Sequence, residues 1–194
     1  MKSGELGHGN IGILAISGSL RRGSSNSALV DALARLAPDW VGVSTYRELG
    51  KLPPFNPDLD GDPAPPAVAR FRAALQACDA VLISSPEYAH GVPGVLKNAL
   101  DWVVGSGELV DKPVALINAS PRATHAQASL TETLDVMSAR LVPEASIAIP
   151  LQGRALDGNG IAADAELSTA LKRAIDALAA AALAKYSGRA AHRR

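Results

Sequence analysis

The strongest constraint on the fold is the alternation of short apolar runs with segments of helical period. The runs are four to six residues long, often β-branched, and bounded by Gly, Pro, Asn or Ser. Between and after them, leucine and alanine recur three and four positions apart, as on one face of a helix. This alternation is typical of a parallel sheet covered by helices on both faces. The sequence therefore predicts an α/β fold.

The same pattern sets the expected order of strands and helices. Strands are expected at residues 11–16, 41–46, 80–83, 114–117 and 146–149. Helices are expected around residues 29–36, 68–75, 96–103, 124–137 and 167–178. Thr124 and Gln127 have the spacing of a capping box, which predicts that a helix begins at Thr124. The proline-rich residues 51–66 suit neither a helix nor a central strand, so we expect a long surface connection there.

Length and charge limit the organisation and the partners of the chain. The 194 residues suit one α/β domain over residues 1–194, with flexible ends at 1–10 and 187–194. Because 19 Lys and Arg balance 19 Asp and Glu, no summed charge favours nucleic acid or an anionic membrane. The apolar stretches are too short to span a membrane, and residues 1–10 lack the apolar region of a signal peptide. We therefore expect a cytoplasmic protein that acts on small molecules.

Cys78 is the single cysteine of the chain. It cannot form an intrachain disulfide, and it follows an apolar helical segment. We expect a buried, chemically inert thiol with no catalytic role.

A polar loop, SGSLRRGSSN, follows the first expected strand and precedes a helix. Ligands of such sheets bind beyond the carboxyl ends of the strands, and the free N–H groups of a helix N-terminus favour an anion. Hydroxyl and amide groups can donate to phosphate oxygens, and a guanidinium can add charge-assisted bonds. The candidate phosphate-binding residues are Ser19, Arg21, Ser24, Ser25, Asn26 and Ser27.

The loop departs from the common nucleotide-binding motifs. Ser24 stands where a P-loop requires Lys, and the loop contains no GxGxxG sequence. A monophosphate is therefore a more natural ligand than a nucleoside triphosphate or a dinucleotide. A simpler alternative is that the serines only cap the following helix, although capping does not require Arg21 beside them.

A second irregular loop follows the third expected strand, in the segment SPEYAHGVPGVLKNALDW. Its Pro and Gly residues suit a backbone that presents N–H and C=O groups to a planar heterocycle. The candidates are Pro86, Glu87, Tyr88, Ala89, His90 and Gly91, with Tyr88 or His90 flanking the ring. The alternative is a plain helix-entry loop in which Tyr88 is a surface aromatic and Glu87 and His90 are solvated.

The helical half of that segment suits a structural role. Lys97 and Asp101 have the i, i+4 spacing of an ordinary pair on a helix surface. Trp102 suits the core or a subunit interface better than a cofactor contact.

Together the two loops resemble the signature loops of the NADPH-dependent FMN reductase family. The resemblance implies a flavodoxin-like three-layer sandwich whose five-stranded parallel sheet has the order 2-1-3-4-5. It also implies noncovalently bound FMN, homodimers or homotetramers, and electron transfer from NADPH or NADH to small-molecule acceptors such as flavins, quinones, azo dyes or metal oxyanions. By this resemblance Ser19, Arg21, Ser24 and Asn26 match the FMN phosphate loop, while Pro86, Glu87 and Tyr88 match the loop that borders the isoalloxazine.

Two positions depart from the family pattern. Ala89 stands where relatives often have Asn, and His90 either replaces that polar side chain or does not. The loop after the fourth strand reads NASPRATHAQ, residues 118–127, where many relatives are glycine-rich. Ser120 and Arg122 are candidates to contact the flavin or a nicotinamide nucleotide phosphate, with a capped helix start as the alternative. The choice between NADPH and NADH stays open.

The resemblance predicts neither a catalytic side chain nor a metal site, because a bound flavin carries the chemistry. Three other functions remain as alternatives. A flavodoxin-type carrier usually presents an acidic surface, which the neutral charge balance disfavours. An FMN-binding module without turnover is compatible with the sequence. A serine hydrolase would use Ser19 with His90 or His125 and an Asp, but the GxSxG elbow is absent.

Overall fold

The computed structural model describes residues 11–151 and 153–191, with side chains to residue 185. In this part of the chain, five parallel strands form one sheet in the order β2-β1-β3-β4-β5, which confirms the predicted order. The strands are β1 (Ile11–Ser17), β2 (Val41–Tyr46), β3 (Ala80–Ser84), β4 (Pro113–Ile117) and β5 (Arg140–Leu141). The strand order reverses between β1 and β3, so a crevice is expected beyond their carboxyl ends.

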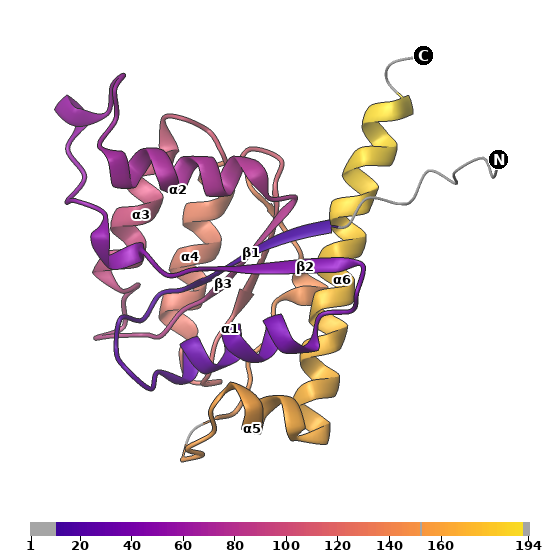
Figure 1. Cartoon of the computed structure of the whole chain (residues 1–194). Helices are drawn as coiled ribbons and strands as arrows, with labels where there is room; N and C mark the ends of the chain where they lie inside the picture. Colours follow the sequence, from indigo (N-terminus) through magenta and orange to yellow (C-terminus); the bar gives the residue numbers. More distant parts are fainter. Residues whose placement is uncertain (1–10, 152, 192–194) are drawn as a thin grey trace.

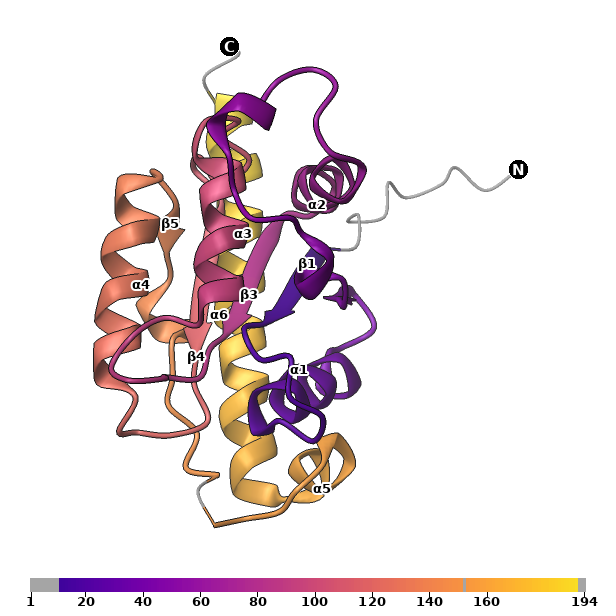
Figure 2. The same ribbon diagram turned by 90° about the vertical axis from the view of Figure 1, so that its left-hand side faces the viewer.

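Helices cover both faces of the sheet, as Figures 1 and 2 show. The helix bounds are α1 (Ser25–Leu36), α2 (Pro66–Ala77), α3 (Gly94–Val104), α4 (Thr124–Val136), α5 (Gly158–Ala163) and α6 (Ala165–Ala191). The apolar residues of α1 and α6 pack on one face of the sheet, and those of α2, α3 and α4 pack on the other. None of the helices in the described residues is both long enough and apolar enough to cross a membrane.

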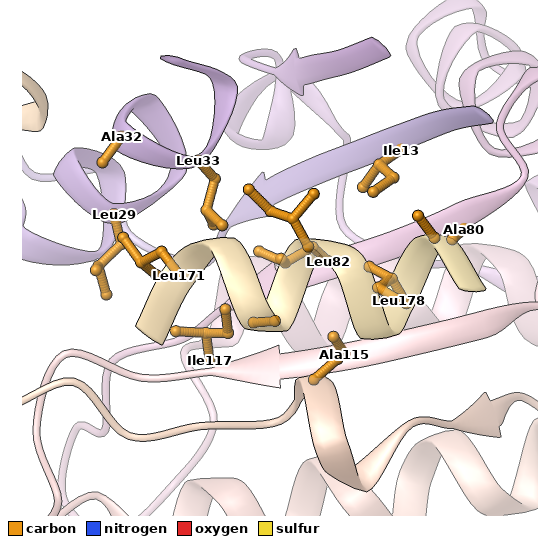
Figure 3. Packing of buried hydrophobic residues seen from close by; sticks show 14 of the residues in the cluster. Ile13, Leu29, Ala32, Leu33, Ala80, Leu82, Ala115, Ile117, Leu171 and Leu178 are labelled. Atoms are coloured by element: carbon orange, nitrogen blue, oxygen red, sulfur yellow. The ribbon is translucent and has the colours of Figure 1, made fainter. Parts of the chain in front are cut away.

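Successive side chains of each strand enter the two cores alternately, because side chains point to opposite faces of a strand. Ile11 and Ile13 of β1 join the cluster under α1 and α6, whereas Leu14 and Ile16 join the other cluster. Figure 3 shows the first cluster, in which side chains from α1 and α6 meet strand residues such as Ile13 and Ile117. The nearly continuous burial of β3 and β4 follows from this coverage on both faces.

The proline-rich connection before α2 lies over α3, and hydrogen bonds hold it there. The Nε1 atom of Trp102 donates to the carbonyl oxygen of Pro53 at 2.8 Å, and Asn98 Nδ2 donates to the same oxygen at 2.9 Å. Trp102 has no exposed surface. Trp102 was expected either in the core or at a subunit interface, and the structure places it in the core.

The fifth strand is not where the sequence predicted it. β5 is Arg140–Leu141, which pairs with Pro113 and Val114 of β4, whereas the strand was expected at residues 146–149. Pro143 begins a 3-10 turn, Pro143–Ala145, which interrupts the extended chain. After the turn the chain returns to β4 in a single bridge between Asn118 and Ala148. The apolar run at residues 146–149 therefore lies along the edge of the sheet after β5 and is not itself the fifth strand.

Two further local features of the structure differ from what the sequence predicted. α4 begins at Thr124 as predicted, but Thr124 is the first helical residue and no side chain caps the helix from position Ala123, so the capping box is wrong. α5 was not predicted, because its sequence GNGIAA has weak helical character. Residues 187–191 lie within the bounds of α6, residues 1–10 and 192–194 lie outside the described residues, and the expected flexibility of both ends stays a prediction.

Candidate functional site

The predicted loops meet in one cleft of about 380 Å³ beyond the carboxyl ends of β1, β3 and β4. This volume lies within the usual range for small-molecule sites. Ten of the predicted residues line the cleft: Ser19, Arg21, Ser24, Ser25, Asn26, Pro86, Glu87, Tyr88, Ser120 and Arg122. The structure adds lining residues that the sequence did not indicate: Ser85, Ala119, Ala123 and Leu151. Four predicted residues, Ser27, Ala89, His90 and Gly91, lie beside the cleft instead of lining it.

One end of the cleft is the N-terminus of α1. Ser24 occupies the N-cap position and is buried, yet its side chain makes no capping hydrogen bond. The first turn of α1 also has no acidic residue. The interpretation that these serines serve only as helix caps is therefore not supported. The hydroxyls and the helix N–H groups leave a donor-rich end that suits an anion.

Asn26 and Ser27 join α1 to the sheet. The buried hydroxyl of Ser84, at the end of β3, donates to Asn26 Oδ1 at 3.0 Å. Ser27 Oγ lies 2.9 Å from Ser17 Oγ of β1 and faces a smaller cleft of about 200 Å³ on the β2 side. Ser27 therefore helps to hold the loop in place from outside the main cleft.

Arg21 lies on the wall between the two clefts and lines both of them. Its Nη2 atom donates to the carbonyl oxygen of Gly23 at 3.3 Å, and Gly23 has a φ of 65°. The left-handed backbone at Gly23 turns the chain into α1, and the arginine stays exposed at the opening of the cleft.

A tight turn after β3 stands beside the cleft, and its first residue, Tyr88, lines it. The backbone N–H of Tyr88 donates to Gly91 O at 3.2 Å, and the N–H of Gly91 donates to Tyr88 O at 2.9 Å. The two residues between them, Ala89 and His90, have φ values of 49° and 60°. Positive φ at both central residues is typical of a type I′ hairpin turn. Tyr88 is half exposed, and its hydroxyl lies 3.5 Å from Ser19 Oγ of the other loop.

Glu87 links this turn to the N-terminus of α4. Its Oε2 atom accepts from the backbone N–H of Ala126 at 2.8 Å, and its Oε1 atom lies 3.2 Å from His90 Nδ1. The Glu87 side chain is only 12% exposed, so it is not the solvated charge of the simpler interpretation. The Ala126 N–H, and secondarily His90, lower the pKa of Glu87 below its ordinary value of 4.5. The sequence did not indicate this contact, because the partner is a backbone group 39 positions later.

The third loop closes the cleft on the β4 side. Asn118 Oδ1 accepts from the N–H of Ser120 at 3.1 Å, and Ser120 Oγ accepts from the N–H of Arg122 at 3.3 Å. These bonds fold the loop into successive turns, so that Ser120 and Arg122 reach the cleft. The His90 and His125 rings pack edge to face beside it, with centroids 4.4 Å apart.

Other reactive side chains of the described residues do not assemble a catalytic cluster here. The Ser19 hydroxyl lies beside Tyr88, whereas the His90 ring lies beside Glu87 and His125. Ser19 and these histidines therefore do not form the Ser–His pair of a hydrolase. No group of three or more His, Cys, Asp or Glu side chains between residues 11 and 185 could hold a metal ion. Cys78 is buried as predicted, and burial raises the pKa of its thiol.

The fold and the cleft define a doubly wound α/β protein with a polar cleft beyond the carboxyl ends of its central strands. The family model for NADPH-dependent FMN reductase matches residues 11–153. The chain is 33% identical over 174 residues to an NAD(P)H-dependent FMN reductase of Pseudomonas aeruginosa, covering 87% of this chain and 94% of that protein. It is 38% identical over 114 residues to a quinone reductase of Pseudomonas putida, covering 57% of this chain and 61% of that protein.

A solved structure shows the same relationship. The flavoenzyme NAD(P)H:acceptor oxidoreductase of Paracoccus denitrificans has a TM-score of 0.76 and 32% sequence identity, covering 89% of this chain and 97% of that chain. This chain belongs to the NADPH-dependent FMN reductase family. It is therefore an FMN-dependent oxidoreductase that takes electrons from NAD(P)H, and its flavodoxin-like fold agrees with the predicted one.

Proposed function

We propose that the cleft holds FMN with the phosphate at the N-terminus of α1 and the isoalloxazine beside Pro86, Glu87 and Tyr88. The observation that carries this proposal is the division of the cleft into two chemically different ends. Uncapped helix N–H groups, serine hydroxyls and Arg21 gather at one end. A proline, an aromatic ring and a tight turn stand at the other. This donor set fits a mononucleotide with a flat ring.

The residues of the cleft then have separate roles. Ser19, Ser24 and Ser25 donate to phosphate oxygens, and Arg21 offsets the phosphate charge at the opening. Pro86 and Tyr88 border the plane of the ring. When bound, FMN supplies the hydride-accepting and electron-donating chemistry, so that no side chain of this chain acts as a nucleophile.

Planar acceptors such as quinones and flavins suit this site best among the acceptor classes. Half-exposed Tyr88 offers an aromatic surface at the opening, against which a planar molecule can stack. The quinone reductase named above supports the same class. Ser120 and Arg122, on the β4 side of the cleft, offer contacts for a phosphate of NADPH or NADH.

The proposal extends to the organisation of the protein. Residues 1–194 form a single cytoplasmic domain that assembles as a homodimer or homotetramer. The zero net charge supports small molecules, rather than nucleic acid or membranes, as its partners. Val104, Val110 and Val136 near the ends of α3 and α4 are all exposed, and burial of such side chains favours self-association.

Replacement of Arg21 tests the placement of the phosphate. We expect Arg21→Ala to weaken FMN binding by about tenfold and to leave riboflavin binding unchanged, since riboflavin has no phosphate. Quenching of flavin fluorescence by the apoprotein measures both affinities. Arg22→Ala is the matched control, because Arg22 is exposed beside Arg21 but does not line the cleft. Equal FMN affinities in the two variants would contradict the proposed placement.

A further inference from the structure

We infer that Glu87 is a positioning residue that joins the loops after β3 and β4 into one wall for the flavin ring. The inference deepens the proposed function and rests on it, because it concerns the ring end of the same cleft. Pro86, Glu87 and Tyr88 line the cleft from one loop, and Ala119, Ser120, Arg122 and Ala123 line it from the other. Between the two groups, the Glu87 carboxylate is bonded to the first turn of α4.

The Oε2 atom of Glu87 accepts a hydrogen bond from the N-terminus of α4. No side chain caps that helix from position Ala123, and its first turn carries no acidic residue. A helix N-terminus has N–H groups without partners in the helix and a positive dipole end. Glu87 Oε2 supplies both the missing acceptor, at 2.8 Å from Ala126 N, and the negative charge. The cap of α4 therefore comes from the loop that borders the flavin ring.

The Oε1 atom of Glu87 contacts the turn that follows Glu87 in the chain. Ala89 and His90 both have positive φ, a conformation that is unfavourable for Ala and for most residues other than Gly, Asn, Asp or His. Glu87 Oε1 lies 3.2 Å from His90 Nδ1, and the His90 ring packs against His125 of α4. One carboxylate thus contacts both the strained turn and the neighbouring helix.

The two ends of the cleft are held by largely different contacts. The phosphate end is held by Asn26 to Ser84 and Ser17 to Ser27, which do not involve Glu87, while the Tyr88 hydroxyl, 3.5 Å from Ser19 Oγ, joins it to the ring end. Loss of the Glu87 carboxylate therefore loosens the ring end and leaves the phosphate end in place. The expected signature is an equal loss of affinity for FMN and for riboflavin, because the two flavins share the ring and differ in the phosphate.

The test measures FMN and riboflavin binding to the full-length apoprotein by fluorescence quenching. We expect Glu87→Ala to weaken both affinities by the same factor, about tenfold, because it removes the acceptor of a charge-assisted bond. Glu87→Gln keeps an oxygen that can accept from Ala126 N–H, so its affinities should stay within about threefold of the wild type. Glu132→Ala removes an exposed carboxylate elsewhere on α4 and is the matched control.

Each outcome of this experiment has a distinct meaning. Wild-type protein that binds neither flavin contradicts the proposed function itself. Wild-type binding with equal affinities for Glu87→Ala and Glu132→Ala overturns the positioning role. A larger loss for FMN than for riboflavin also overturns it, because it shows a general loosening that reaches the phosphate end. If Glu87→Ala does not fold, Glu87→Gln decides, and a tenfold loss in that variant overturns the inference.

Discussion

Ala89 and His90 are two successive residues whose backbone has a positive φ. Both occupy the left-handed region within a two-residue turn, where Asn and Gly are the favoured residues. The family resemblance placed Asn at the position of Ala89, and the structure gives the physical reason. The conformation is held by the two hydrogen bonds between Tyr88 and Gly91 and by the contact of His90 with Glu87.

Replacement of Ala89 should relieve part of this strain. We expect Ala89→Asn to raise the free energy of unfolding by about 0.5 to 1 kcal/mol, because Asn tolerates positive φ better than Ala. Urea unfolding of the apoprotein measures the change. Ala69→Asn is the matched control, because Ala69 is exposed within α2, where Asn should lower the stability. A loss of stability in Ala89→Asn would show that the turn is not strained at this residue.

Glu87 should contribute to stability in a manner that depends on pH. Its pKa in the folded protein is lowered, chiefly by the Ala126 N–H, so its contribution is complete above the ordinary pKa of 4.5. The contribution is lost as the pH falls through the lower pKa of the folded state. Urea midpoints of the wild type and Glu87→Gln should therefore differ most near pH 7 and converge below pH 4.5. A difference that grows as the pH falls has the wrong sign for this account.

At the scale of elements, the long elements followed from the sequence and the short ones did not. Periodicity located α1, α3 and α6, because each lays a continuous apolar stripe on the sheet. β5 and α5 were not predicted, because a two-residue strand and a glycine-containing helix are formed by tertiary contacts rather than by local preference. The polar loops predicted most of the cleft lining. The contact between Glu87 and α4 was not predictable, because backbone N–H groups carry no sequence signature.

The packing of α5 on α1 makes a prediction at this scale. A Cβ atom at Gly158 would lie 2.9 Å from Asp31 Cβ and 3.3 Å from the backbone N of Ala32. We expect Gly158→Ala to lower the free energy of unfolding by about 1 to 3 kcal/mol, because the helices must separate to accept the methyl group. Gly94→Ala is the control, since a Cβ there meets no atom within 4 Å. Equal urea midpoints for the two variants would show that this contact is not tight.

At the scale of the whole molecule, the fold brings together three loops that are far apart in the sequence. Apart from Leu151, which follows β5, the cleft takes its residues from the loops after β1, β3 and β4, which meet because the strand order reverses between β1 and β3. Two apolar cores hold the strands below the cleft, so the loops rest on a rigid support. We propose that these loops position the flavin and that no side chain of this chain acts as a catalyst, because a bound flavin supplies the chemistry.

The reduction of bound flavin by a nicotinamide nucleotide tests the central claim most directly. Flavin-loaded protein is mixed rapidly with NADPH, and separately with NADH, in the absence of oxygen, while the flavin absorbance is followed. The account predicts that the oxidised flavin absorbance is lost in the reaction with at least one of the two donors. Absorbance that persists with both donors would contradict the reductase function and leave an electron carrier or an FMN-binding module without turnover.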